Sequence, residues 1–591
     1  MHPHSSLTCL LSALWSHIDR HQRRQLYLLL TLMMLVAATE MISIGAIFPF
    51  LAALTAPEKV FAHPWGQWCA NVLALTKPTD LLAPITIIFG IAIVIAGAMR
   101  LLLVWVQTKI AYAIGADMAL EVYRKTLHQP YTVHTSRNSS EIINGVYSKA
   151  AGISSYVILP VITIISSFAV VSAILLTLVS VDPVVSLIAL TGFAAIYGGV
   201  AKLTHRRLYE NSRLVADEAG KVIRSLQEGL GGIRDVLLDR SQAVYCSIFR
   251  RADLSMRNAQ INSAFIAQSP RFVMEAMGML LIALLAYQLT ATDGGVIGAM
   301  PVLGALALGA QRMLPLLQQC FQAWSSIKSN QASLADTLAL LEQPLPTHLS
   351  ADDLSLLPHQ HHLQLDDVWF RYAADSDWVL NGISITIPKG AKVGFIGTTG
   401  CGKSTLLDIV MGLLPPTRGR LLVDGIPLDD KNLPRWQLHL AHVPQAVFLA
   451  DSSIASNIAF GIPADKIDMD LVTDAARRAQ LLDTIESWPD GFSTQVGERG
   501  VRLSGGQRQR IGIARALYKK ADVLIFDEAT SALDNDTEEA VMKAVDALGA
   551  DITVLIIAHR INTLRNCNII FELGKGNVVR RSSYQEILAN P

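Results

Sequence analysis

A glycine-rich loop that ends in a lysine and two hydroxyl residues is the part of the sequence best suited to chemistry. It follows an apolar run ending at Ile396, and it reads Gly397-Thr398-Thr399-Gly400-Cys401-Gly402-Lys403-Ser404-Thr405. Glycines let backbone N–H groups turn inward around phosphate oxygens, and the start of a following helix adds positive potential. The Lys403 ammonium can reach the β- and γ-phosphates, and the Ser404 hydroxyl can ligate Mg²⁺. Between an expected strand at 393–396 and an expected helix at 406–411, this pattern predicts a phosphate-binding loop.

Two carboxylates follow the apolar run at 523–526. Asp527 is placed to hold Mg²⁺ through water, and Glu528 to polarise the attacking water. Phosphoryl transfer needs positioning and charge neutralisation more than covalent chemistry, so two carboxylates with these roles are sufficient. Taken alone, an apolar run ending in two acids is more often followed by an ordinary surface loop. Together with the phosphate loop, it predicts ATP hydrolysis.

A third motif, Leu503-Ser504-Gly505-Gly506-Gln507, opens an expected helix, RQRIGIARAL. Alone it would be a modest anion-binding turn. With the two motifs above it completes the set of an ATP-binding cassette, and the chain resembles ABC transporters over essentially its whole length. The resemblance implies a homodimer with two competent sites, because each ATP is clamped between Lys403 of one chain and 504–507 of another.

The resemblance also implies roles for residues that stand in the family's order. Tyr372 matches the aromatic side chain that stacks on adenine, Gln445 matches the Q-loop glutamine, and His559 matches the switch histidine. The segment Ser531–Asp534 matches the D-loop, and Thr494–Gly500 resembles the loop that exporters place against their coupling helices. A lone histidine after a strand is usually structural, but here its place in the order favours the functional role.

The expected site can therefore be stated by role, with Cys401 as a small departure because this variable position is often Ser or Ala. The implied cofactors are ATP and Mg²⁺. The implied catalytic residues are Glu528, His559 and Gln445. The implied metal ligands are Ser404, Gln445 and Asp527. The implied ATP contacts are Tyr372, Gly397, Thr398, Thr399, Gly400, Cys401, Gly402, Lys403, Ser404, Thr405, Ser504, Gly505, Gly506, Gln507 and Asp534.

The composition places much of the chain in lipid. Of its 591 residues, 51% are hydrophobic and only 17% are charged, and the mean hydropathy is +0.37. Soluble proteins average roughly 25% charged residues. Lys+Arg and Asp+Glu both number 49, and this balance argues against a nucleic-acid partner. The six cysteines show no CxxC or metal-ligand spacing, so neither a disulfide framework nor a zinc site is implied.

Apolar runs dominate until the chain changes character near residue 340. Six are long enough for a bilayer, which takes about 20 helical residues: 26–54, 82–112, 156–181, 183–203, 265–290 and 295–325. Beyond them, short β-branched runs alternate with amphipathic helices, as in an α/β fold around a largely parallel sheet. We therefore expect a six-helix, exporter-type membrane domain at 1–343, a linker at 344–361 and an α/β P-loop cassette at 362–591.

Basic residues predict the orientation. With the N-terminus inside, arginine pairs such as Arg206-Arg207 and Arg250-Arg251 lie in cytosolic segments, and the outside loops hold only Lys59 and Lys77. Segments 113–155 and 204–264 then read as cytosolic extensions of membrane helices. The resemblance implies a multi-pass protein of the bacterial inner membrane with its cassette in the cytosol.

Three segments resemble flippases for lipid-linked oligosaccharides: 47–61, 130–145 and 227–240. In those proteins the place of 57–80 is taken by an external helix, and here it carries Phe61, Trp65 and Trp68. An ordinary outside loop with buried aromatics is the alternative for this segment. The expected substrate is a polyprenyl-pyrophosphate glycan. The alternatives are a lipid A, multidrug or peptide exporter, or a cassette protein that regulates a channel without transport.

Ionisable residues inside the expected spans have two interpretations. Charge within a bilayer is costly and faces a cavity or a partner. Arg271 and Glu275 are four residues apart and could pair on one helix face. Arginines in a cavity, including Arg100 and Arg312, could instead bind a pyrophosphate headgroup. Glu40 is the remaining charged residue of this kind.

Overall fold

The computed structural model describes residues 6–55, 57–64, 67, 71, 77–181, 183–290, 295–345, 356–530, 532–547, 549, 551–558 and 560–589. The chain forms two compact units. The first comprises Met1–Gln129 and His134–Leu345, and the second comprises Pro130–Val133 and Pro346–Pro591. The linker expected at 344–361 lies mostly outside the described residues, so its bounds, like those of the two expected domains, stay a prediction.

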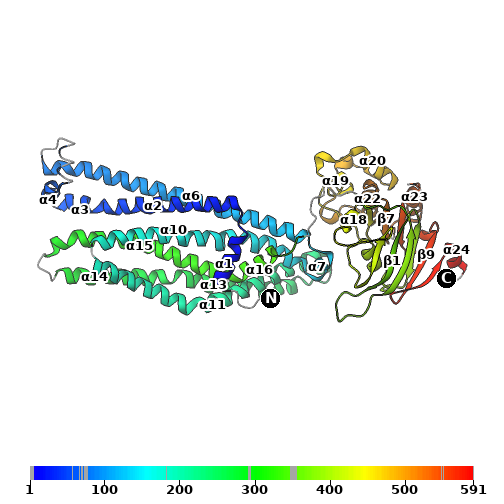
Figure 1. The fold of residues 1–591 in the computed structure, drawn as a ribbon, viewed down its shortest axis with the longest axis horizontal. Helices are drawn as coiled ribbons and strands as arrows, with labels where there is room; N and C mark the ends of the chain where they lie inside the picture. The colour runs from blue at the N-terminus through cyan, green and yellow to red at the C-terminus, as the bar shows by residue number, and fades with distance from the viewer. Residues whose placement is uncertain are drawn as a thin grey trace. The chain divides into compact units, whose positions relative to one another are not determined.

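The first unit is built from long helices, drawn in blue to green in Figure 1, and α2 packs against α6, α10 against α15, and α11 against α13. Each of the six expected spans is helical over its described residues, apart from a single turn residue at Ala46 and at Ser269. The helices are α1 (Leu7–Ser16), α2 (Arg20–Gly45), α3 (Ile47–Thr55), α4 (Pro57–Ala62), α6 (Leu82–Leu127), α7 (Tyr131–Ser136), α8 (Ser139–Ile143), α10 (Leu159–Val181), α11 (Pro183–Gly231), α12 (Ile233–Leu238), α13 (Gln242–Gln268), α14 (Pro270–Thr290), α15 (Gly295–Ser329) and α16 (Gln331–Leu341).

Length and hydropathy identify three membrane-crossing candidates among the described helical stretches: Arg20–Leu54, Pro78–Leu127 and Ser139–Thr177. Their outward faces carry large apolar side chains, as in Val94 and Leu101, which are 70% and 73% exposed. Such faces suit lipid, because a helix satisfies its own backbone hydrogen bonds and only its side chains meet the bilayer. The spans expected at 183–203, 265–290 and 295–325 lie on α11, on α14 with the end of α13, and on α15.

A π-helical stretch interrupts the predicted cytosolic extension that precedes α10. It covers Asn144–Ala150 and Ser154–Ile158, separated by one short α-helical turn. Gly115 on α6 faces it, and a Cβ at this glycine would lie 2.5 Å from the Ser154 Cβ. The backbone of α6 and that of the π-helical stretch therefore lie so close together that a side chain at position 115 would clash.

The second unit contains a six-stranded sheet in the order β10-β9-β3-β8-β7-β6. All neighbours are parallel except β9 and β10, which agrees with the largely parallel sheet expected from the sequence. The strands of this sheet are β3 (Lys392–Gly397), β6 (Leu440–Val443), β7 (Val523–Asp527), β8 (Thr553–Ile557), β9 (Ile569–Gly574) and β10 (Asn577–Ser582).

Both faces of this sheet are buried. On β7, Val523 and Ile525 pack into one apolar core, and Leu524 and Phe526 pack into another on the opposite face. Successive side chains of a strand point to opposite faces, so a doubly covered strand reads as a continuous apolar run. The surrounding helices are α17 (Lys403–Val410), α18 (Leu433–Gln437), α19 (Ile454–Ile458), α20 (Met469–Arg478), α21 (Leu482–Glu486), α22 (Gly505–Tyr518), α23 (Asn535–Asp546) and α24 (Tyr584–Ala589), several of which Figure 1 labels in yellow to red.

A second, antiparallel sheet has the order β2-β1-β4-β5. Its strands are β1 (His362–Phe370), β2 (Leu380–Pro388), β4 (Arg418–Val423) and β5 (Ile426–Pro427). The alternation of strands and helices in the sequence did not distinguish it from the parallel sheet. The signal was present in the alternation of buried Leu363 and Leu365 with Gln364, which is the pattern of a strand with one covered face.

Candidate ATP-binding site

The loop between β3 and α17 has a backbone that requires glycine. Gly397 and Gly402 have φ angles of 143° and 101°, in the region that side-chain-bearing residues rarely adopt. A Cβ on Gly397 would lie 2.2 Å from the carbonyl oxygen of Leu573 on β9. Gly402 is the residue just before the first turn of α17. The free backbone N–H groups of that first turn therefore face the centre of the loop.

Lys403, the first residue of α17, folds back over this loop. Its Nζ donates hydrogen bonds to the carbonyl oxygens of Gly397 at 2.8 Å and Thr398 at 3.1 Å, and the residue is only 7% exposed. The buried Cys401 lies beside it, with its Sγ 3.9 Å from Nζ. The ammonium is therefore held at the centre of the loop, where it can exchange carbonyl oxygens for phosphate oxygens.

Carboxylates gather where β7 ends. Asp527 accepts a hydrogen bond from the Ser404 hydroxyl. Burial, together with the charge of Glu528, raises the pKa of Asp527, although Ser404 and Lys403 act in the opposite direction. The order of motifs had predicted that Ser404 and Asp527 work together, and the structure brings them into contact.

Asp408 is a further carboxylate that the sequence reasoning missed. Burial, and then the charge of Asp527, raise its pKa to about 6. It stands four residues after Ser404 on α17, so both side chains share one helix face. That spacing was the available signal, but an aspartate in a helical run is usually an ordinary exposed residue, so Asp408 did not stand out.

This group of side chains fits Mg²⁺. The donors are oxygens: the Ser404 hydroxyl, the Asp527 carboxylate, and close by the side chains of Glu528 and Gln445. Magnesium prefers hard oxygen ligands and usually keeps several waters alongside one or two carboxylates and substrate phosphates. Burial first, and neighbouring carboxylate charge second, raise the pKa of Asp408 and of Asp527, and a divalent cation would stabilise their charged forms. Among the described residues, no cluster of three or more His, Cys, Asp or Glu residues forms a self-sufficient metal site.

Glu528 and Gln445 point toward one another across adjacent strands. Gln445 follows β6, and its Nε2 donates to the Glu528 Oε2 at 2.7 Å. Glu528 itself has a φ of 50°, although it is neither glycine nor asparagine. Such a left-handed residue costs on the order of 1–3 kcal/mol and persists only where its surroundings hold it. Its N–H donates to the Ile557 carbonyl oxygen at 3.0 Å, which fixes the turn that aims the side chain.

Tyr372 lies beside the phosphate loop, just after β1. Its hydroxyl is 3.2 Å from the Thr405 Oγ1, and its ring meets Phe370 edge to face. The side chain remains 60% exposed, so one part of the ring is available to a planar ligand. This placement suits the expected adenine contact, which stays a prediction.

The signature motif forms a regular helix start. Ser504 caps α22: its hydroxyl accepts from the Gln507 N–H at 3.2 Å, and the Gln507 Oε1 accepts from the Ser504 N–H at 2.8 Å. Gly505 and Gly506 occupy the first turn, where the Ala532 carbonyl oxygen would lie 3.2 Å from a Cβ on Gly506. Among the described residues, no hydrogen bond or ion pair joins 397–405 to 504–507. The structure therefore brings the sheet-edge residues together and leaves the signature apart from them.

Asp534 has a local structural role that the resemblance did not indicate. It caps α23 by accepting from the N–H of Thr537 at 3.1 Å and from its hydroxyl at 2.8 Å. The hydrogen bond from the Thr537 hydroxyl and that from its N–H lower the pKa of Asp534. Nearby, the Gln509 side chain of α22 accepts from the Ala532 N–H at 3.0 Å, which ties the D-loop segment to the signature helix. Ser531 lies outside the described residues.

His559 also lies outside the described residues, as do Trp65 and Trp68 of the predicted external segment. The residues that follow His559 are held by Glu538, a buried carboxylate on α23. Glu538 accepts from Thr530 at 2.9 Å, from Thr563 at 2.6 Å and from Arg560 at 3.3 Å. It links the turn after Glu528 to the segment after β8, and neither motif spacing nor composition had singled it out.

The charges in the membrane unit pair with each other. Arg271 Nε lies 2.6 Å from the Glu275 Oε1 on α14, as expected for residues four apart. Arg312 on α15 pairs with Glu40 on α2 at 2.6 Å, a partnership between helices 272 residues apart that spacing alone could not reveal. Arg100 lines a cavity of about 40 Å³ with Glu40 and Gln107.

Comparisons with known proteins agree with the arrangement. Residues 27–294 match the ABC transporter transmembrane region family, and residues 380–531 match the ABC transporter family. An ATP-dependent lipid A-core flippase of Cupriavidus metallidurans is 29% identical over 593 aligned residues, covering 98% of this chain and 94% of that one. One from Alkalilimnicola ehrlichii is 32% identical over 67% of both chains. The heterocyst differentiation ATP-binding protein HepA of Nostoc is 28% identical over 96% of this chain and 92% of its own.

A solved structure extends the likeness to the fold. A bacterial Atm1-family ABC exporter with ATP bound superposes with a TM-score of 0.79 at 21% identity, covering 97% of both chains. An exporter-type helical membrane domain fused to a P-loop ATPase cassette is the class that fold and site define. The chain belongs to the ABC transporter family, and it is a membrane-spanning ATP hydrolase coupled to transport.

Proposed function

We propose that the protein is one half of a homodimeric flippase of the bacterial inner membrane, and that it moves a lipid with a large phosphorylated saccharide headgroup. The lipid A-core type of substrate is favoured over the polyprenyl-pyrophosphate glycan that the sequence segments suggested. The observation that carries this preference is the alignment with a lipid A-core flippase over 98% of the chain, which includes the membrane unit as well as the cassette.

A cavity in the membrane unit supports a large amphipathic substrate. It measures about 1,040 Å³ and lies between the 144–157 stretch, α11, α13 and α15. Pockets for drug-sized ligands span about 300–1,000 Å³. Its lining mixes apolar side chains with Gln260 and with Lys149 and Arg257, which pair with Asp336 and Asp253 and would have to exchange these partners for a phosphate. Sugar hydroxyls can find polar partners there that hydrocarbon cannot offer.

The cassette residues suit ATP hydrolysis between two copies. Lys403 would neutralise the β- and γ-phosphates, Ser404 and Asp527 would hold Mg²⁺, and Glu528 would accept a proton from the attacking water. A bound Mg²⁺ would offset charge on the phosphates. The signature residues 504–507 are capped and make no described contact with the loop, which leaves them available to a partner's nucleotide.

A polyprenyl-pyrophosphate oligosaccharide is the second candidate. It rests on the resemblance of 47–61, 130–145 and 227–240, and on α4, a short helix at the start of the predicted external segment. The phosphate argument from arginines serves both candidates equally, since both headgroups are phosphorylated. In the described structure, moreover, Arg271 and Arg312 have carboxylate partners.

The test is flipping in proteoliposomes with two substrates in parallel, a lipid A-core glycolipid and a polyprenyl-pyrophosphate oligosaccharide. We expect ATP-dependent flipping of the first, together with stimulation of ATPase activity, and weaker flipping of the second. The Glu528→Gln protein is the control for ATP dependence. Selective flipping of the oligosaccharide would overturn the substrate preference, and stimulation by neither lipid would overturn the flippase proposal.

A further inference from the structure

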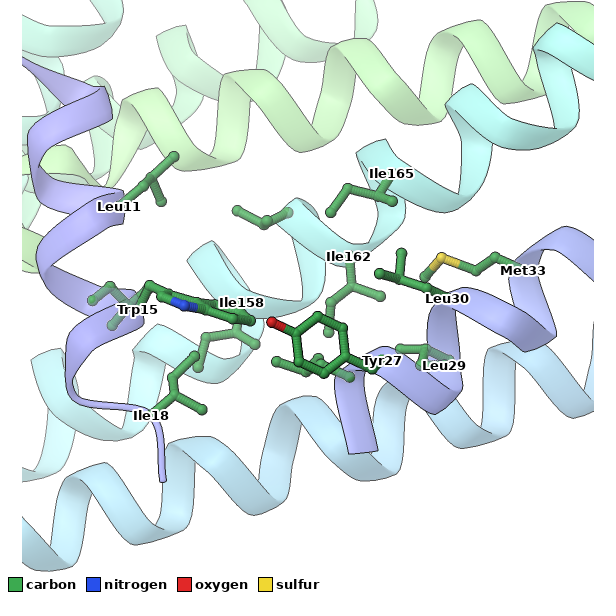
Figure 2. A pocket seen from close by; sticks show the side chains of 13 residues that line it. Leu11, Trp15, Ile18, Tyr27, Leu29, Leu30, Met33, Ile158, Ile162 and Ile165 are labelled. Carbon is green, nitrogen blue, oxygen red and sulfur yellow. The ribbon is translucent and has the colours of Figure 1, made fainter. Parts of the chain in front are cut away.

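A cavity of about 250 Å³ lies between α1, α2 and α10, on a different set of helices from the large cavity between α11, α13 and α15. Figure 2 shows Leu11 on α1, Ile18 in the connection from α1 to α2, Met33 on α2, and Ile162 on α10 around it. Its lining is almost wholly apolar: the Trp15 indole N–H and the Tyr27 hydroxyl are its only polar side-chain groups.

The cavity has a covered interior and an exposed rim. Leu29, Met33 and Ile162 are at most 4% exposed, whereas Tyr27 and Leu30 on the rim are 58% and 41% exposed. Because the rim is exposed, an acyl chain of a bilayer lipid can enter the cavity. Lipid chains are as apolar as leucine, so burial alone gives a chain little reason to prefer this cavity to the bilayer. Any preference has to come from a headgroup.

Cationic and aromatic groups stand together at one side of the cavity. The Arg23 guanidinium lies 5.6 Å from the centre of the Trp15 ring, and that ring meets Tyr27 edge to face at 6.4 Å. Arg23 also donates to the carbonyl oxygens of Trp15 and Ser16, which fixes the C-terminal end of α1 against α2. Tryptophan and tyrosine favour the headgroup level of a membrane.

The charge balance around this rim is positive. Arg20 and Arg24 are exposed on the first turns of α2, one turn apart. Two acids stand near them: Asp19 accepts from the His21 N–H and interacts electrostatically with Arg20, and Asp117 accepts from Gln22. The three arginines at 20, 23 and 24 still outnumber these two carboxylates. The basic residues of α2 also mark the cytosolic side in the predicted orientation, and there the anionic lipids of a membrane attract arginine.

We infer that this cavity binds one acyl chain of an anionic glycerophospholipid from the cytoplasmic leaflet, with the lipid phosphate beside Arg20 and Arg24. The Trp15–Tyr27 pair then stands at the level of the glycerol backbone. This site is separate from the transported substrate and holds for either candidate in the preceding section. It would fasten α1 to the first membrane helix through a lipid.

The probe is a phosphatidylglycerol with a photoreactive diazirine in one acyl chain, diluted into phosphatidylcholine liposomes that contain the full-length protein. After irradiation, adducts should map to 11–33 and 158–165. Leu30→Trp places a large ring in the mouth and should remove most of this labelling. Leu28→Trp, on the same helix outside the lining, is the matched control and should label as the unmodified protein does.

Headgroup selectivity is tested by replacing Arg20 and Arg24 together with Gln. Each surface arginine contributes roughly a fivefold preference for anionic lipid, so the double variant should lose about 25-fold of the preference for the phosphatidylglycerol probe over a phosphatidylcholine probe. The control is the double replacement of Arg206 and Arg207 on α11, which should leave the preference intact. Thermal melting checks that each variant is folded.

Three outcomes would overturn the inference. Labelling that is no higher at the cavity than on the exposed α6 surface around Leu101 would mean ordinary bilayer contact. Displacement of the probe by a transported lipid, but not by unlabelled phosphatidylglycerol, would give the cavity to the substrate. Chain-to-chain cross-links through Leu30→Cys in place of lipid adducts would give it to a second copy.

Discussion

The ATP-binding site of the cassette and the ion pairs of the membrane unit differ in one respect. The residues of the first come from short sequence motifs, whereas those of the second are far apart in the sequence. At the sheet edge of the cassette, short motifs supply almost every group, because the carboxyl ends of parallel strands meet there. In the membrane unit the principal ion pair joins Glu40 to Arg312, from opposite ends of the domain. Motifs therefore identify the ATPase, whereas the substrate depends on contacts that only the folded helices bring together.

The largest expected effect lies at the cassette. Glu528→Gln keeps the size of the side chain and a hydrogen bond with Gln445 but removes the carboxylate. Steady-state ATPase activity should fall by about 10²–10⁴-fold, the range of a lost general base, and ATP binding should remain. Glu539→Gln, on the exposed face of α23, is the control and should be near normal. Near-normal hydrolysis by the Glu528 variant would remove that residue from its proposed role.

The phosphate loop gives the second effect. Gly397→Ala would place a Cβ 2.2 Å from the Leu573 oxygen in a strained backbone conformation. The loop should distort, and ATP affinity measured by equilibrium binding should drop by about 5- to 150-fold, as expected from roughly 1–3 kcal/mol of strain. Gly461 also has a positive φ, +85°, but open space around its Cβ, so Gly461→Ala is the control for a substitution without the clash. Equal affinities for both variants would contradict this geometry.

Breaking the two ion pairs of the membrane unit should lower its stability to different extents, because one pair is more buried than the other. The Glu40 side chain is 8% exposed and that of Arg312 is 30% exposed, whereas Arg271 and Glu275 are 53% and 40% exposed. Arg312→Met leaves a buried carboxylate without its partner, which typically costs about 3–5 kcal/mol, and it should lower the melting temperature in detergent clearly. Arg271→Met should cost about 0–1 kcal/mol. Removing Glu40 and Arg312 together should recover part of the loss.

The smallest effect concerns Asp408. Its pKa is raised to about 6 from the usual 3.8, so the folded protein holds the proton more tightly than the unfolded chain. The charged carboxylate therefore destabilises the fold above pH 6, and this penalty disappears as the pH falls from 6 toward 4. The side chain is partly solvated, so we expect about 1 kcal/mol at most after screening. Asp408→Asn should raise the melting temperature at pH 7.5 but not at pH 4, and the exposed Asp430→Asn should change neither.

The sequence could predict the sheet edge because each motif carries its own backbone rule. Gly397 and Gly402 indicate a loop with positive φ angles, and the continuous apolar run at 523–526 before Asp527 indicates a strand that is buried on both faces. Asp408 and Glu538 could not be found in this way, since the groups that they contact come from distant parts of the sequence. The cap formed by Asp534 was likewise invisible in a motif that the resemblance had assigned to ATP.

Within the membrane unit, the sequence predicted where helices run, because hydrophobicity and length suffice for that. It also offered the Arg271–Glu275 pair as one of two interpretations, and the structure shows this pair within a single helix. It could not choose between pairing and substrate binding for Arg312, since its partner lies 272 residues away. The substrate preference moved from a lipid-linked glycan to a lipid A-core type because whole-length relatives outweigh three short segments.

The most direct measurement concerns the shared ATP site. Chains with Lys403→Ala and chains with Ser504→Arg, each carrying a different tag, are purified as heterodimers and photolabelled with azido-ATP. A site built from two chains is restored only in the heterodimer, where Lys403 of the Ser504→Arg chain meets Ser504 of the other. We predict trapped nucleotide on the Ser504→Arg chain in the heterodimer and on neither homodimer. Equal trapping by the Ser504→Arg homodimer, or none in the heterodimer, would contradict a site shared between two copies.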